Sequence, residues 1–188
     1  MDTAGFYRHG GIRAHELIRE ALAPYRDDLV IATKAEPLRD ADGVFRGQAR
    51  PAELRSLVEE DLRRLGVPSL DLVYLRPGGV GPDGSSEAKR FAVLTELREA
   101  GPIRHLGLSN VDAAQLEEAR SIAPVAAVQN HFHVQNPEDR RLLAGCERLG
   151  IAYVPFFPLG GGSVPVDDAR VRAVAQRRSA SVAQVSLA

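Results

Sequence analysis

The hexapeptide LDLVYL at residues 70–75 decides the fold class of this 188-residue chain. All of its residues except Asp71 are apolar, which is typical of a strand whose two faces are both covered, as in parallel sheets. Four other short apolar runs lie at residues 29–33, 103–108, 126–130 and 151–156. Longer segments with helical periodicity separate them. This alternation predicts repeated βα units, and therefore an α/β protein with a parallel sheet.

Recognisable start signals define several of the intervening helices. Pro51 suits the first position of a helix, and Asp112 with Gln115 resembles a capping box. The predicted helices cover residues 52–65, 113–122 and 136–149. The stretch at residues 78–86, rich in glycine and serine, is predicted to be a long loop between a strand and a helix.

The bulk composition excludes several classes of protein. With 24 basic and 25 acidic side chains the net charge is −1, so no overall field attracts nucleic acid or an anionic membrane. No apolar run is long enough to cross a bilayer, and no signal peptide precedes the first motif, so we expect a cytoplasmic protein. The single cysteine, Cys146, is expected to be a buried and inert thiol.

An acid, a tyrosine and a lysine fall at the ends of neighbouring predicted strands. Lys34 follows the apolar run at residues 29–33, and it is one of only two lysines beside 22 arginines. Asp2 and Tyr7 lie at the start of the chain. Such a group can form a proton relay, in which the ammonium lowers the pKa of the phenol and the carboxylate keeps the ammonium charged. Tyr7 would then protonate a carbonyl oxygen.

Polar and aromatic residues at later strand ends are suited to a cofactor. Ser109, Asn110 and Gln129 carry hydroxyl and amide groups that can recognise a carboxamide. Phe156 can stack on a planar ring, and the glycine-rich loop after it can bring backbone N–H groups to a pyrophosphate.

The same residues leave alternatives open. His131 and His133 could share a metal ion, but no carboxylate or cysteine is placed to complete the site, so no metal is assigned. Lys34 could form a Schiff base in a barrel aldolase, a scheme that has no use for the amide cluster.

Taken in order, the motifs resemble the aldo-keto reductase family. They are Asp2-Thr3-Ala4 with Tyr7, IATK at residues 31–34, LDLVYL at 70–75, IRHLGLSN at 103–110, VQN at 128–130 and PLG at 158–160. The resemblance implies a parallel (β/α)8 TIM-type barrel. It also implies an NADP(H)-dependent oxidoreductase that reduces an aldehyde or ketone, a small-molecule carbonyl substrate.

The resemblance assigns roles residue by residue. Tyr7 corresponds to the proton donor, with Lys34, Asp2 and Arg76 as the other catalytic residues. The residues implied to bind the cofactor are Ser109, Asn110, Gln129, Phe156, Pro158, Leu159 and Gly160.

The sequence departs from the family in two respects. Arg76 stands where the family usually has a histidine, as in a subgroup that includes pyridoxal reductase-like members; a cofactor-binding barrel with little turnover is therefore a further alternative. In addition, a complete barrel takes about 250 residues. Residues 1–188 are expected to form a single partial barrel domain with about six of eight βα units. Such a chain alone is expected to bind NADPH weakly.

Overall fold

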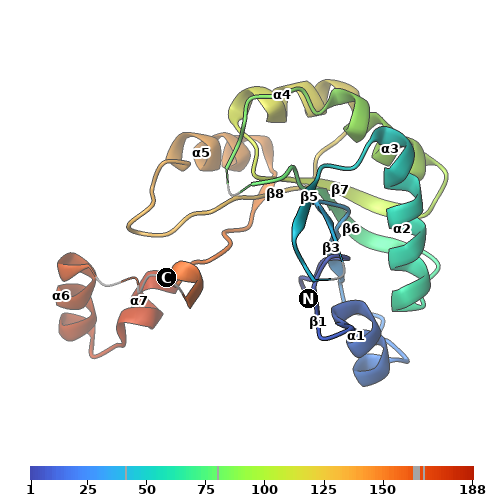
Figure 1. Cartoon of the computed structure of the whole chain (residues 1–188). Helices are drawn as coiled ribbons and strands as arrows, with labels where there is room; N and C mark the ends of the chain where they lie inside the picture. Colours follow the sequence, from blue (N-terminus) through green and yellow to red (C-terminus); the bar gives the residue numbers. More distant parts are fainter. Residues whose placement is uncertain (41, 80, 163–165, 167) are drawn as a thin grey trace. The chain divides into compact units, whose positions relative to one another are not determined.

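A computed structural model describes residues 1–40, 42–79, 81–162, 166 and 168–188 (Figure 1). The chain divides into two compact units, Met1–Val128 and Gln129–Ala188. Its main sheet has the hydrogen-bonded order β3-β6-β7-β8-β9. The members are β3 (Ala32–Lys34), β6 (Leu70–Leu75), β7 (Ile103–Ser109), β8 (Ala127–Gln129) and β9 (Ala152–Tyr153).

Strand β6 forms the centre of the first unit. It pairs in parallel with β3 on one side and with β7 on the other. Its apolar residues are buried or half-buried, as the continuous hydrophobic run predicted. Parallel strands that follow one another in both sequence and space, with right-handed connections, place all their helices on one face. That arrangement belongs to a β/α barrel rather than to a doubly wound sheet, so the predicted fold class is confirmed for the part of the barrel that this chain covers.

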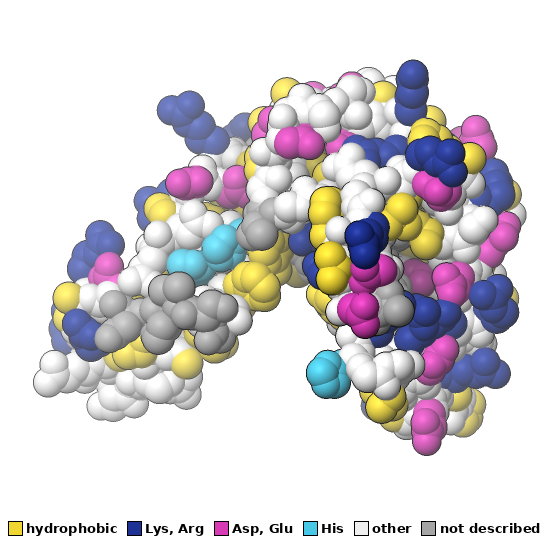
Figure 2. All heavy atoms as spheres, in the orientation of Figure 1, with side chains coloured by type: hydrophobic (Ala, Val, Ile, Leu, Met, Phe, Trp, Pro, Cys, Tyr) yellow, Lys and Arg dark blue, Asp and Glu magenta, His cyan; other side chains and the backbone are white. Residues whose placement is uncertain are grey.

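Four helices accompany these strands. Along the chain, neighbouring helices pack against each other, and α3 also packs against β7. They are α1 (Ala14–Leu22), α2 (Pro51–Leu65), α3 (Ala88–Glu99) and α4 (Ala113–Ile122). On the face of this unit seen in Figure 2, acidic and basic side chains are interspersed rather than separated by sign.

Two short hairpins flank the strand ends of the first unit. One is formed by β1 (Arg8–His9) and β2 (Ile12–Arg13), the other by β4 (Leu38–Arg39) and β5 (Phe45–Gly47). The sequence patterns did not predict either hairpin, because each strand is only two or three residues long.

The second unit begins at the end of β8. It contains β9, α5 (Arg140–Leu149), the 3₁₀ turn η1 (Gly160–Gly162), α6 (Ala169–Arg178) and α7 (Val182–Leu187). Cys146 is buried in α5 and unpaired, as expected. No helix among the described residues has the length and hydropathy of a membrane span.

Several predicted boundaries were wrong. The helix expected from residue 136 begins at Arg140, because Asn136 uses its amide on His131 instead of capping the helix. The strand expected at 29–33 is displaced to Ala32–Lys34, where the N–H of Ile31 bonds to the Asp71 side chain just before the strand.

The last two strands are shorter than predicted. Residues 126–130 give the strand Ala127–Gln129, and residues 151–156 give Ala152–Tyr153. Pro155 has no N–H to continue a ladder, which accounts for the early end of β9. A further strand was expected at the very start of the chain, as the first of about six. It is reduced to an isolated parallel bridge between Asp2 and Ala32. The predicted loop at 78–86 is irregular throughout its described residues, which exclude residue 80.

Candidate active site

Lys34 and Asp2 form a close ion pair at the end of β3. The ammonium lies 2.8 and 2.9 Å from the two carboxylate oxygens, and 2.9 Å from the carbonyl oxygen of Thr3. The Thr3 N–H donates to the Ala32 carbonyl oxygen and the Ala32 N–H to the Met1 carbonyl oxygen; these bonds hold the start of the chain beside β3 and position the carboxylate. The side chain of Lys34 is 4% exposed and that of Asp2 is 45% exposed.

The electrostatics of this pair follow from burial. Burial lowers the pKa of Lys34 below its ordinary value, and the hydrogen bond and charge of Asp2 act in the opposite direction. The predicted role of the carboxylate, to keep the ammonium charged, agrees with that direction. All three N–H donors of Lys34 have acceptors, so the amine is not free to attack a carbonyl; this geometry does not favour the Schiff-base alternative.

Tyr7 lies next to this pair, on a turn that follows Asp2. Its ring centroid is 5.6 Å from Lys34 Nζ, and its ring meets that of Phe6 edge-on at 5.0 Å. Tyr7 is 44% exposed, and its hydroxyl has no hydrogen-bond partner among the described residues. The phenol is therefore accessible and unengaged beside the buried Lys34 ammonium.

The expected lowering of the tyrosine pKa was wrong in direction. Burial, and secondly the charge of Asp2, raise the pKa of Tyr7 above its ordinary value, while Arg76 and Arg39 act to lower it. The negative charge of Asp2 opposes ionisation of the Tyr7 phenol, an effect that the sequence could not show. Tyr7 consequently keeps its proton at neutral pH.

Arg76 immediately follows β6 and is half-buried. Its guanidinium donates to the carbonyl oxygen of Gly79 at 3.0 Å and to that of Pro77 at 3.4 Å. Its Cζ lies 5.6 Å from the centroid of the Phe6 ring. The cationic donor expected after β6 therefore lies against Phe6, the residue whose ring also contacts Tyr7.

Ser109 ends β7 and Asn110 follows it, and both are buried. Asn110 adopts a left-handed backbone conformation (φ 59°), and its Nδ2 donates to the carbonyl oxygen of Gly79 at 2.9 Å. The Ser109 hydroxyl and the Asn110 Oδ1 are both buried without a hydrogen-bond partner. Buried polar atoms in this state need an explanation. A hydroxyl donor and an amide acceptor together match the oxygen and the NH2 group of a carboxamide, so these residues fit a nicotinamide.

The other predicted cofactor residues belong to the second unit. Gln129 is buried at the end of β8. Phe156 is held by a hydrogen bond from its N–H to the carbonyl oxygen of Asn130, and its ring stacks on that of His131 at 5.4 Å and 12°.

The loop of Pro158, Leu159 and Gly160 follows directly. The Gly160 N–H closes a turn on the carbonyl oxygen of Phe157 at 2.8 Å, and Phe157 and Gly161 have positive φ angles. A turn built this way can present backbone N–H groups to an anion.

The metal site left open for His131 and His133 needs at least one further ligand. Their rings lie 5.0 Å apart, but no group of three or more His, Cys, Asp or Glu side chains that could hold a metal ion occurs in the described part of the chain.

The sequence missed a buried charge cluster behind the ion pair. Glu36, two residues after Lys34, accepts the N–H of Ala49 at 2.7 Å and lies 3.6 Å from Arg90. Arg90 also pairs with Glu87. Burial raises the pKa of Glu36 to about 7. The sequence feature that could have indicated this cluster is a glutamate placed just after a buried apolar strand.

A second missed cluster supports β3 from the side of α1 and α2. His15 and Asp61 are buried, with Nδ1 and Oδ1 3.2 Å apart, and the Thr33 hydroxyl lies 3.1 Å from each side chain. Gly5 packs so closely on Asp61 that a Cβ there would lie 2.4 Å from Oδ1. The cluster fixes the strand residue that precedes Lys34.

Known proteins that resemble this chain identify its family. The model of the aldo/keto reductase family matches residues 1–187. The chain belongs to the aldo/keto reductase family. It is 42% identical, over its whole length, to pyridoxine 4-dehydrogenase of Escherichia coli K12, and covers 66% of that protein.

Two solved structures of the family show the same fold. A glycerol dehydrogenase from Gluconobacter oxydans has a TM-score of 0.80 at 26% identity, with 98% of this chain and 66% of that chain covered. An aldo/keto reductase from Klebsiella pneumoniae, in complex with NADP and acetate, has a TM-score of 0.75 at 25% identity, with 99% and 63% covered. The chain therefore spans just under two thirds of these relatives.

Proposed function

We propose that the protein to which this chain belongs reduces an aldehyde or ketone to an alcohol, with NADPH as reductant. The observation that carries the proposal is the unengaged Tyr7 hydroxyl beside the buried Lys34 ammonium and its partner Asp2. The orphaned Ser109 and Asn110 atoms support the cofactor assignment. When bound, the nicotinamide supplies a hydride to the carbonyl carbon.

The residues of the chain would perform the proton chemistry. Tyr7 donates its hydroxyl proton to the carbonyl oxygen, which is possible because its raised pKa keeps the phenol protonated at neutral pH. The phenolate that remains is stabilised by the cations that act on it, Arg76 and Arg39. Lys34, held by Asp2, keeps a further positive charge 5.6 Å from the ring.

Arg76 stands where the family usually has a histidine, so a charged donor would replace a neutral one. A guanidinium donates hydrogen bonds to a carbonyl oxygen but cannot exchange a proton at neutral pH. Its function in this proposal is therefore to stabilise developing negative charge, and Tyr7 alone transfers the proton.

We infer that the cofactor is held by Ser109, Asn110 and Gln129 at the carboxamide and by Phe156 at the nicotinamide ring. The loop at Pro158, Leu159 and Gly160 would take the pyrophosphate. Residues 1–188 would form one domain that is part of a larger barrel.

Pyridoxal is the first substrate to test, because the relative at 42% identity is a pyridoxine dehydrogenase. The experiment follows NADPH oxidation at 340 nm by the full-length protein with pyridoxal and a panel of aldehydes, with Tyr7→Phe as the matched variant. We expect turnover that the variant loses by roughly 10²-fold or more. Tight NADPH binding with no oxidation of any aldehyde would replace this proposal by a cofactor-binding barrel with little turnover.

A further inference from the structure

Three arginines surround the aromatic residue next to Tyr7. The Cζ atoms of Arg39 and Arg76 lie 5.3 and 5.6 Å from the Phe6 ring centroid. Arg8 joins them through a hydrogen bond from Nη2 to the carbonyl oxygen of Arg39, at 3.0 Å. Arg8 and Arg39 come from the two hairpins and Arg76 from the end of β6, so segments far apart in sequence meet here.

The charges of these arginines are not neutralised by the protein. Their guanidinium groups donate to backbone carbonyl oxygens, Arg39 to Gly43 at 2.7 Å and Arg76 to Gly79. Within the described residues, none of the three forms an ion pair. The contrast with Arg46 is direct, since this neighbour on the second hairpin pairs with Asp40.

The nearest acids are engaged elsewhere. Asp2 is bound by Lys34. Glu36 acts on Arg76 through space, but it is buried, accepts the Ala49 N–H, and its pKa near 7 leaves it only partly ionised at neutral pH. Phe6 contributes the face of a π-system, which attracts guanidinium groups without cancelling their charge.

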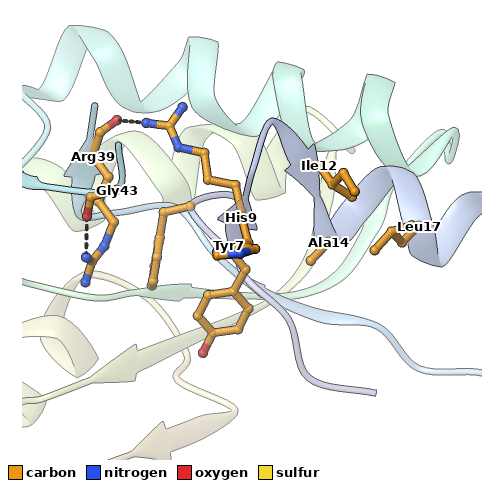
Figure 3. A pocket seen from close by; sticks show the side chains of 9 residues that line it. Tyr7, His9, Ile12, Ala14, Leu17, Arg39 and Gly43 are labelled. Carbon is orange, nitrogen blue, oxygen red and sulfur yellow. Dashed lines mark hydrogen bonds between the residues drawn. The ribbon is translucent and has the colours of Figure 1, made fainter. Parts of the chain in front are cut away.

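An open cavity of about 590 Å³ lies between α1 and the side chains of Arg8 and Arg39 (Figure 3). Its lining includes Phe6, Tyr7, Arg8, His9, Ile12 and Arg39, and no acidic residue. The volume is in the range of small-molecule sites. The Nε atom of Arg8 is buried and has no hydrogen-bond partner in the described structure. The cavity thus combines an apolar wall, the candidate proton donor and cationic side chains that have no ion-pair partner among the described residues.

We propose that this cavity selects carbonyl substrates that carry an anionic group, a carboxylate or a phosphate, which Arg39 and Arg8 bind. The inference rests on the proposed function and names its substrate class. Guanidinium groups bind both anions through paired N–H donors, and a neutral carbonyl compound would leave these donors unused. Arg76, which also faces Phe6, is kept for the carbonyl oxygen.

The test compares substrates that differ chiefly in charge, with kcat/KM expressed per free aldehyde, because pyridoxal closes to an internal hemiacetal and its 5′-phosphate does not. We would measure kcat/KM of the full-length protein for 4-carboxybenzaldehyde and for its methyl ester, and separately for pyridoxal 5′-phosphate and pyridoxal. A preference of about tenfold or more for the anionic member of a pair is expected, through KM. The first pair reports a carboxylate site and the second a phosphate site.

Variants connect the preference to the cavity. Arg39→Gln should reduce the anion preference about tenfold or more. Because Arg39 also acts on Tyr7, its loss lowers the turnover of the ester and of pyridoxal as well, and the readout is therefore the ratio of kcat/KM within each pair. Arg39→Lys should restore part of the preference, and Arg46→Gln should have no effect because that arginine is already paired. Arg39 is exposed, so the variant is expected to fold, and Arg8→Gln provides a second test.

The outcomes separate the two proposals. NADPH affinity, from the quenching of its fluorescence, should be the same in all variants; a parallel loss would assign these arginines to the cofactor and overturn the inference. Equal kcat/KM for both members of each pair, with steady turnover, would also overturn it and leave the reductase intact. No turnover with any of the four compounds would instead count against the proposed reductase.

Discussion

Asp2 holds Lys34 through both carboxylate oxygens, at 2.8 and 2.9 Å, although the two residues come from different segments of the chain. The same carboxylate raises the pKa of Tyr7. One acidic side chain thus favours the charged form of the lysine and the neutral form of the tyrosine. An ammonium beside a protonated phenol is the state that a proton-donating site requires.

The first prediction concerns Asp2→Asn in the full-length protein. Without the carboxylate, the pKa of Lys34 falls further and the pKa of Tyr7 loses one of the causes that raise it. Both changes move the alkaline limb of the pH profile of kcat/KM to lower pH. We expect a loss of roughly 10²-fold at pH 7. Asp28→Asn, at an exposed pair with Arg26, is the control and should leave the profile in place. An unshifted alkaline limb in Asp2→Asn would contradict this account.

The second prediction concerns the buried Glu36. Its pKa in the folded protein, about 7, lies above its ordinary 4.5, so the folded state binds the proton more tightly than the unfolded state. The free energy of unfolding should therefore fall as pH rises from about 4.5 to 7 and then level off, with a total change of a few kcal/mol.

Urea unfolding between pH 4 and 8 measures this dependence. Glu36→Gln has no titrating proton but keeps an acceptor for the Ala49 N–H. The variant should show a flatter dependence, with a residual slope from Glu87, whose pKa burial also raises. Identical slopes in both proteins would show that Glu36 is not the group that titrates.

The sequence predicted the fold best where the hydrophobic pattern alone determines it. The run at Leu70–Leu75 and the helix at Ala113–Ile122 were predicted with their observed ends, because burial on both faces and a capping box are local signals. The predicted start of α5 was wrong. Whether Asn136 or Asp139 precedes the first helical residue depends on His131, which lies outside the helix and accepts a hydrogen bond from Asn136.

The site was predictable as a set of residue types but not in its electrostatics. Lys34, Asp2 and Tyr7 were expected together, and the structure brings them together. The direction of the Tyr7 pKa depends on depth and on distances to several charges, which no linear pattern contains. Arg8 and Arg39 were missed for a similar reason, since the hairpins that carry them are too short to be recognised in sequence.

The third prediction tests packing at β7. A Cβ on Gly107 would lie 2.6 Å from Tyr74 Cδ1 and 3.0 Å from the carbonyl oxygen of Ala127. Because Tyr74 is buried, it has little room to move, and Gly107→Ala should lower the free energy of unfolding by about 1–3 kcal/mol. Gly145→Ala is the matched variant: it lies inside α5 with no atom nearer than 3.9 Å, and should stabilise by about 0.5–1 kcal/mol. Chemical denaturation of both variants checks the opposite signs, and equal effects would refute the packing argument.

The last prediction separates the place of Asn110 in a backbone turn from its proposed function as a ligand for the cofactor. Its φ of 59° is costly for a residue with a Cβ that lacks a compensating hydrogen bond, so Asn110→Ala should be less stable than Asn110→Gly by about 1–2 kcal/mol. Both variants lose the bond from Nδ2 to the Gly79 carbonyl oxygen and the buried Oδ1 acceptor. If that acceptor binds the carboxamide, both should lose NADPH affinity to the same extent, about tenfold, when fluorescence titrations are made well below the melting temperature of each. Affinity that follows stability, with Asn110→Gly close to the parent protein, would mean that Asn110 shapes the turn and does not bind the cofactor.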